Sequence, residues 1–131
     1  MDIVEKIKKA KRIYLIGNGG SYANAQHIAN DLLACGIKAY TLEPSALTAF
    51  ANDYGFHTVF ARWLEVVGTS EDLLIALSGS GKSPNILTAI ETAERIGMEV
   101  VKVFGAPQLG MQEAEEMQLV LGHKLRFALC E

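Results

Sequence analysis

The stretch Arg12-Ile-Tyr-Leu-Ile-Gly-Asn-Gly-Gly-Ser21 decides the fold, because an apolar run leads directly into a glycine-rich turn. A short continuous run of apolar, β-branched and aromatic residues is typical of a strand covered on both faces, as in a parallel sheet. Ser21 can cap a helix that extends to Cys35 and is closed by Gly36. The sequence therefore predicts a strand, a turn suited to a ligand and a helix in immediate succession.

The same alternation of strands and helices continues to the end of the chain. Strands are predicted at Arg12–Ile16, Lys38–Leu42, Asp72–Leu77, Glu99–Phe104 and Met117–Leu121. Helices are predicted at Ser21–Cys35, Pro44–Asn52 (or a turn), Phe56–Val67, Ser83–Ile96 and Met111–Glu116. Such alternation with short links predicts an α/β domain with helices on both faces of a parallel sheet. We expect one doubly wound domain over residues 1–131, with five parallel strands in the order 2-1-3-4-5.

Composition excludes several classes of protein. Half of the 131 residues are apolar and 21% are charged, as in a globular domain, and the net charge of −3 argues against a nucleic-acid surface. No apolar stretch approaches the ~20 residues of a membrane span, and no signal-peptide pattern opens the sequence. Cys35 and Cys130 make no metal-binding spacing, so we expect free thiols, Cys35 buried as a small hydrophobe, in a reducing cytoplasm.

Two polar turns follow predicted strands and open predicted helices. The first carries Asn18, Gly19, Gly20 and Ser21, and the second reads Ser78-Gly79-Ser80-Gly81-Lys82-Ser83. Both lie at the carboxyl edge of the sheet, where open α/β folds bind ligands. Glycines allow close backbone approach, and hydroxyls beside a helix N-terminus supply donors to an anion. We therefore expect both turns to bind a small phosphorylated metabolite, with its phosphate at the second turn.

Two nucleotide-binding alternatives fit the turns less well. A dinucleotide fingerprint needs a third glycine where this chain has Tyr22, although Glu43 stands near the place of its acid. A nucleotide P-loop would match Gly81, Lys82 and Ser83, but Ala76 stands at its leading glycine and no downstream aspartate follows the fourth strand. An NTPase is therefore kept as the third functional hypothesis, ranked after the two that are introduced below.

Three ordered motifs resemble the sugar isomerase (SIS) domain, and in particular the phosphoheptose isomerases. They are Gly17-Asn-Gly-Gly-Ser21, Asn52-Asp-Tyr-Gly55 and Leu77-Ser-Gly-Ser-Gly-Lys-Ser-Pro-Asn85, and the likeness runs from about Lys11 to Val120. The resemblance implies interconversion of sedoheptulose 7-phosphate and a heptose 7-phosphate. It assigns the phosphate to Ser78, Ser80 and Ser83, places Asn18 and Ser21 in the sugar site, and puts Asp53 on the family's aspartate.

Aldose–ketose isomerisation through an enediolate needs a base near C1 and C2 and an acid near the oxygens. His27 and Asp31 are four residues apart, hence on one face of the helix that begins at the first turn. A solvated helix face would produce the same pattern. The resemblance makes Asp31 the counterpart of the family's catalytic glutamate. It also implies a possible zinc ion on His27 and Asp31, with no other cofactor required.

The chain departs from the family in two ways: Asp31 stands where the family has its catalytic glutamate, and the end of the chain differs. The family's catalytic histidine lies on a C-terminal helix that we expect this chain to lack, leaving His57 and His123 as stray candidates for the acid. A non-catalytic phosphosugar-binding or assembly module is therefore the alternative function. We also expect a homo-oligomer, because a minimal domain should leave an apolar helix face uncovered. That face comprises Phe56, Val59, Phe60 and Trp63.

Overall fold

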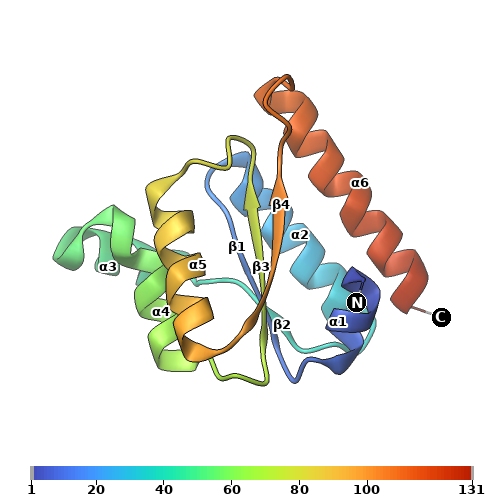
Figure 1. Cartoon of the computed structure of the whole chain (residues 1–131), viewed down its shortest axis with the longest axis horizontal. Helices are drawn as coiled ribbons and strands as arrows, with labels where there is room; N and C mark the ends of the chain where they lie inside the picture. The colour runs from blue at the N-terminus through green and yellow to red at the C-terminus, as the bar shows by residue number, and fades with distance from the viewer. Residues whose placement is uncertain (1, 131) are drawn as a thin grey trace.

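The computed structural model describes residues 2–130 and is built around a four-stranded parallel sheet (Figure 1). The strands are β1 (Ile13–Ile16), β2 (Ala39–Tyr40), β3 (Leu73–Ser78) and β4 (Glu99–Phe104). Their order is β2-β1-β3-β4, and all three pairings are parallel. All residues of β1 and β3 are buried, because these strands are covered by helices on both faces. The predicted α/β architecture and the order of the first four strands are confirmed.

Helices cover the two faces of the sheet in two layers (Figure 1). One layer contains α1 (Ile3–Lys9), α2 (Gly20–Ala34) and α6 (Met111–Leu129). The other contains α3 (Pro44–Tyr54), the 3-10 turn η1 (Phe56–Thr58), α4 (Val59–Val67) and α5 (Pro84–Ile96). Each layer has its own apolar core against the sheet. Within residues 2–130, no helix combines the length and apolarity needed to cross a membrane.

The predicted fifth strand at Met117–Leu121 is wrong, because these residues lie inside the long helix α6. The buried residues of α6 are Ala114, Gln118, Gly122 and Leu125. Their spacing of three to four residues is that of a helix face, whereas a strand would bury every second residue. The short apolar run Leu119-Val-Leu121 fits either pattern, and only the longer period distinguishes them.

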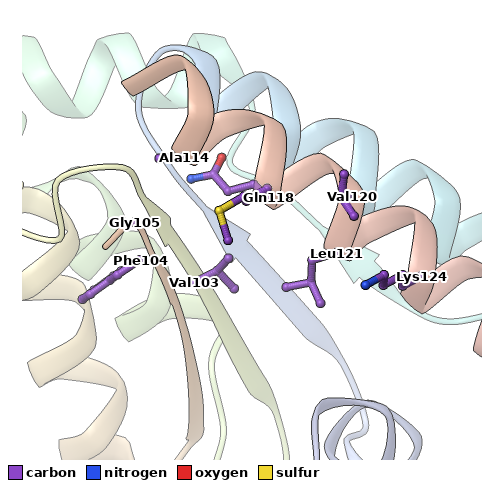
Figure 2. A pocket seen from close by; sticks show the side chains of 9 residues that line it. Val103, Phe104, Gly105, Ala114, Gln118, Val120, Leu121 and Lys124 are labelled. Atoms are coloured by element: carbon purple, nitrogen blue, oxygen red, sulfur yellow. The ribbon is translucent and has the colours of Figure 1, made fainter. Parts of the chain in front are cut away.

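β4 is consequently an edge strand of the sheet. Beside it, β4 and α6 enclose a groove of about 360 Å³ (Figure 2). Its lining is mostly apolar and comprises Val103, Phe104, Gly105, Ala114, Met117, Gln118, Val120, Leu121 and Lys124. The groove lies where a fifth strand was expected, and α6 takes over part of that strand's role by covering this end of the core.

The apolar face expected to be uncovered is largely covered. Val59 and Phe60 are fully buried in the core formed by α3, α4 and α5, and Trp63 packs edge-on against Tyr14. Only Phe56 is strongly exposed, at 51%. The expectation is therefore wrong for Val59 and Phe60, because α5 lies across α4 and shields them.

Candidate active site

The two predicted turns lie side by side at the carboxyl edge of the sheet and form a pocket of about 270 Å³. The pocket is lined by Asn18, Gly19, Gly20, Ser21, Ser78, Gly79, Ser80, Ser83, Met111 and Glu115. Every turn residue predicted to bind substrate therefore borders one pocket. Asp53 does not, because it lies exposed at the end of α3, where its carboxylate accepts a hydrogen bond from Asn52.

The serine turn gathers three hydroxyl groups at the N-terminus of α5. Ser78 Oγ accepts a hydrogen bond from the Gly81 N–H at 2.9 Å, and this places Ser78 Oγ 3.5 Å from the hydroxyls of both Ser80 and Ser83. Ser80 Oγ in turn accepts from the Lys82 N–H at 3.1 Å. Hydroxyls that converge on the positive end of a helix dipole are suited to several oxygens of one phosphate group.

A reciprocal amide pair joins the two turns. Asn18 Nδ2 donates to Asn85 Oδ1 at 2.8 Å, and Asn85 Nδ2 donates back to Asn18 Oδ1 at 2.9 Å. Asn85 lies in the first turn of α5 and is buried, so this pair fixes the glycine turn relative to the serine turn. The pairing could not be predicted from local sequence patterns, since the partners are 67 residues apart.

Replacing Asn18 by Asp is expected to lower both stability and phosphate affinity. A carboxylate has no donor, so one bond of the pair is lost and two acceptors face each other, which costs about 1–3 kcal/mol. The added charge also opposes a phosphate in the same pocket. Urea denaturation and titration with inorganic phosphate measure the two effects. Asn30→Asp, on the exposed side of α2, is the matched control, and equal losses in both variants would contradict the assignment.

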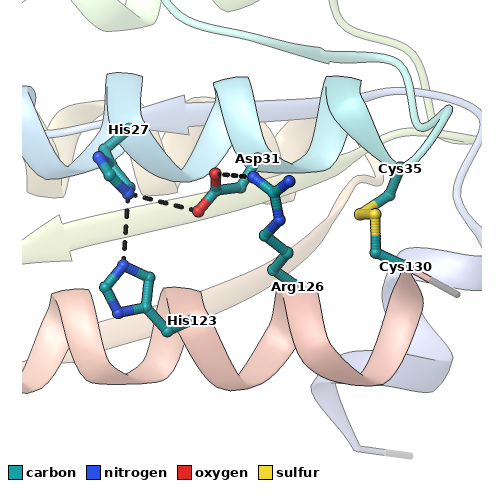
Figure 3. Close-up of polar contacts among 6 residues, drawn as sticks. All are labelled: His27, Asp31, Cys35, His123, Arg126 and Cys130. Carbon is teal, nitrogen blue, oxygen red and sulfur yellow. Dashed lines mark hydrogen bonds and ion pairs between the residues drawn. A yellow bond between two sulfur atoms is a disulfide. The ribbon is translucent and has the colours of Figure 1, made fainter.

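A second group of polar side chains lies between α2 and α6 (Figure 3). His27 Nε2 is 3.4 Å from His123 Nε2 and 3.4 Å from Asp31 Oδ2. One ligand atom from each of the three residues lies within 4.8 Å of the others. The expectation that the chain lacks a C-terminal helix with a histidine is therefore wrong, because α6 is that helix and His123 projects from it toward α2. His57 lies elsewhere, exposed in η1.

Asp31 is buried in this cluster, with 5% of the residue exposed. Its Oδ1 accepts a hydrogen bond from Arg126 at 2.6 Å, whereas its buried Oδ2 accepts none within residues 2–130. The solvated-face interpretation is therefore wrong for Asp31. Two imidazole nitrogens and one carboxylate oxygen that accepts no hydrogen bond lie around a common point and form a donor set that zinc prefers, so these residues fit such an ion. Arg126 holds the carboxylate from behind, as an outer partner of a metal ligand does.

Comparison with known proteins identifies the family. Residues 2–105 match the SIS domain family. The chain belongs to the SIS domain family. Its relatives include the phosphoheptose isomerase of Bradyrhizobium sp. strain BTAi1, 43% identical over 90% of this chain and 64% of that protein. Another is the phosphoheptose isomerase of Campylobacter concisus, 41% identical over 92% of this chain and 68% of that protein. The chain thus spans about two thirds of the length of the curated relatives it matches.

Two solved structures of phosphoheptose isomerases have the same fold as this chain. The phosphoheptose isomerase of Neisseria gonorrhoeae superposes with a TM-score of 0.90 at 28% identity, over 97% of this chain and 80% of that chain. The phosphoheptose isomerase of Francisella tularensis superposes with a TM-score of 0.88 at 27% identity, over 97% of this chain and 79% of that chain.

In this SIS domain, Tyr22 occupies the position that a dinucleotide fold needs for its third glycine. Its hydroxyl donates a hydrogen bond to the Leu42 carbonyl, beyond the end of β2. Burial and the neighbouring Glu43 carboxylate raise the pKa of Tyr22 above its ordinary value. The tyrosine thus fills the space beside β2 where a dinucleotide fold binds a ribose, which disfavours that reading.

A buried polar network holds α6 on the first turns of α2. Gln118, with 1% exposed, donates to Ser21 Oγ at 3.0 Å and accepts from Asn24 Nδ2 at 2.9 Å. Farther along, Gly122 allows close contact, because a Cβ there would lie 2.5 Å from Ile28 Cγ1. Sequence reasoning missed Gln118 because it assigned this segment to a strand. A period-four pattern of small or polar residues from Ala114 was the signal that could have found it.

A disulfide joins the C-terminal ends of the same two helices (Figure 3). Cys35 follows α2, Cys130 follows α6, and their Cα atoms are 4.7 Å apart. The expectation of free thiols is therefore wrong, and Cys35 is half-buried rather than a core residue. A separation of 95 residues left no sequence signal, because only the packing of α6 on α2 brings the two together.

Proposed function

We propose that this domain is a phosphosugar isomerase of the phosphoheptose type, which interconverts an aldose and a ketose through an enediolate. The observation that carries the proposal is the His27–Asp31–His123 cluster: His27 and Asp31 lie on α2, which begins at the pocket formed by the two turns, and His123 faces them from α6. The curated relatives support it, since both named above are phosphoheptose isomerases. The pocket alone would support only a class of ligand. The pocket and the cluster together support a reaction.

The positions of the pocket and of the cluster suggest which part of the substrate each of them would bind. The phosphate would bind Ser78, Ser80 and Ser83, and the first hydroxyls would meet Asn18 and Ser21. His27 lies six residues beyond Ser21, which is about 9 Å along the helix axis. The reacting carbons would therefore lie at the far end of the sugar from its phosphate, as in a seven-carbon chain with a terminal phosphate.

At that far end, Asp31 is the proposed base that moves the proton between C1 and C2. His123, paired with His27, is the proposed acid that protonates the developing enediolate oxygen. Zinc is the proposed optional cofactor: His27, Asp31 and His123 would hold it, and it would polarise the sugar oxygens in place of proton donation by His123. Arg126 keeps the Asp31 carboxylate oriented in either case.

The deciding experiment is incubation of the protein with sedoheptulose 7-phosphate, with and without zinc, and detection of heptose 7-phosphate. Turnover is the expected result. Binding without turnover under both conditions would reject the isomerase proposal and leave the alternative of a phosphosugar-binding or assembly module. Magnesium-dependent ATP binding that is lost in Lys82→Ala would favour the NTPase reading instead.

Replacing Ser80 and Ser83 by Ala separates a ligand turn from a plain helix cap. Each hydroxyl lost from a phosphate removes a charge-assisted hydrogen bond, so affinity for the sugar phosphate is expected to fall about tenfold or more per change. The double variant should bind almost nothing while its circular dichroism spectrum stays unchanged. Thr48→Ala, on exposed α3, is the control. Binding that survives the double change would place the phosphate at the glycine turn.

We further propose a homo-oligomer and a cytoplasmic location, where sugar phosphates are made and used. The oligomer rests on the resemblance to a family that shares sites between subunits, and sedimentation velocity at micromolar concentration tests it. In the cytoplasm, glutathione and thioredoxin would act on the Cys35–Cys130 bond, so its state there depends on its reduction potential.

A further inference from the structure

Two helix N-termini border the pocket formed by the two turns, and a different group lies at each of them. The N-terminus of α5 faces the hydroxyls of Ser78, Ser80 and Ser83. The N-terminus of α2 faces a carboxylate of the protein itself. Glu115 lies against the backbone of Gly20, the first residue of α2, so closely that a Cβ on Gly20 would overlap the carboxylate. A negative charge is favourable at that place because it meets the positive end of the helix dipole.

The turn of α6 that carries Glu115 is fixed on α2. The Glu115 carbonyl accepts a hydrogen bond from Asn24 Nδ2 at 2.9 Å, and Gln118 on the next turn is anchored to Ser21. The Glu115 side chain lines the pocket and is half-buried. Within residues 2–130 its carboxylate forms no ion pair or hydrogen bond, so its oxygens are available to a ligand.

We infer that Glu115 is a specificity-determining residue, which accepts sugar hydroxyls at the α2 side of the pocket and repels a second anion there. The inference rests on the proposed function and narrows its substrate class. The domain selects sugars with a single phosphate, which binds at α5, and with uncharged hydroxyls at the α2 side. An anion with a second charge close to its phosphate would place that charge at the α2 side of the pocket, where the Glu115 carboxylate opposes it at short range.

The test compares inorganic phosphate with inorganic pyrophosphate, whose second phosphate lies next to the first and therefore reaches the α2 side of the pocket. Calorimetric titrations with the two anions give a ratio of affinities. In the unmodified protein pyrophosphate is expected to bind at least tenfold more weakly. Glu115→Gln, which keeps the shape and an acceptor oxygen but removes the charge, should reduce that ratio about tenfold. Glu116→Gln is the matched control, because it removes the same charge from the exposed neighbouring residue and should leave the ratio unchanged.

A second variant moves the carboxylate without removing its charge. In Gly20→Ala the new Cβ occupies the place of the Glu115 carboxylate, which can swing away because it ends a flexible side chain. Alanine is well tolerated in a helix, so the fold should be retained. We expect the discrimination against pyrophosphate to weaken in this variant too.

The ratio depends only on binding, so it is independent of whether the domain turns a sugar phosphate over. Unchanged discrimination in Glu115→Gln, or equal binding of both anions by the unmodified protein, overturns the inference and leaves the isomerase proposal intact. Clear discrimination in a protein that does not turn over sedoheptulose 7-phosphate rejects the isomerase and supports the role of Glu115. Failure of the unmodified protein to bind phosphate, pyrophosphate or sedoheptulose 7-phosphate overturns both.

Discussion

Replacing His123 by Ala is expected to lower the kcat for isomerisation of sedoheptulose 7-phosphate by at least 100-fold. General acid–base groups typically contribute factors of ~10²–10⁴, and His123 faces both His27 and Asp31 across the contact between α2 and α6. KM should change much less, because the serines proposed to bind the phosphate line the pocket at the two turns, which does not include His123. Steady-state kinetics at saturating zinc and in the presence of a chelator measure the effect under both conditions.

His57→Ala is the matched control, since this histidine is exposed in η1 and remote from the cluster. It should retain full activity. A thermal denaturation curve for His123→Ala shows whether the helix contact survives the substitution. If a folded His123→Ala variant keeps more than a tenth of the normal kcat, His123 is not the acid and the proposed mechanism fails at that step.

Replacing Cys35 by Ser is expected to lower the free energy of unfolding by about 2–4 kcal/mol, which is roughly 10 °C in Tm for a chain of this size. The bond closes a loop of 95 residues, and such a long loop restricts the unfolded chain strongly. Calorimetry of the oxidised protein and of the variant measures the difference.

Cys130→Ser and the double variant provide the control, because all three should lose the same amount if the two sulfurs act only as one bond. Reductant should lower the Tm of the unmodified protein to that of the variants and leave the variants unchanged. Alkylation of both thiols in the native, non-reduced protein would show instead that the bond is absent in solution.

The elements around the two turns were predictable because their signals are local. Buried strands such as β1 and β3 appear as continuous apolar runs, and the glycine and serine turns follow them directly. Parallel strands bring their carboxyl ends to one edge of a sheet, so the meeting of the two turns followed from topology alone. The pocket residues from Asn18 to Ser83 could therefore be found without a structure.

The second half of the site depends on contacts between distant residues. His123 lies 96 residues beyond His27, and its importance follows only from α6 packing along α2. The centre of that helix was predicted as a strand, so Gln118 was overlooked. Glu115 lay in the predicted short helix, but its place in the pocket depends on the packing of α6 on α2. The cysteine pairing was missed for the same reason, since it is set by where two helices end.

The bond between Cys35 and Cys130 gives the chain an unusual covalent shape: a closed ring with a linear tail that ends in α2. Asn18, His27 and Asp31 belong to the tail, whereas Ser78, Ser80, Ser83 and His123 belong to the ring. The pocket and the His27–Asp31–His123 cluster each therefore combine residues of the tail with residues of the ring. A protease that cuts one loop of the ring leaves a single covalent molecule, and the pieces separate in mass only after a reductant opens the bond.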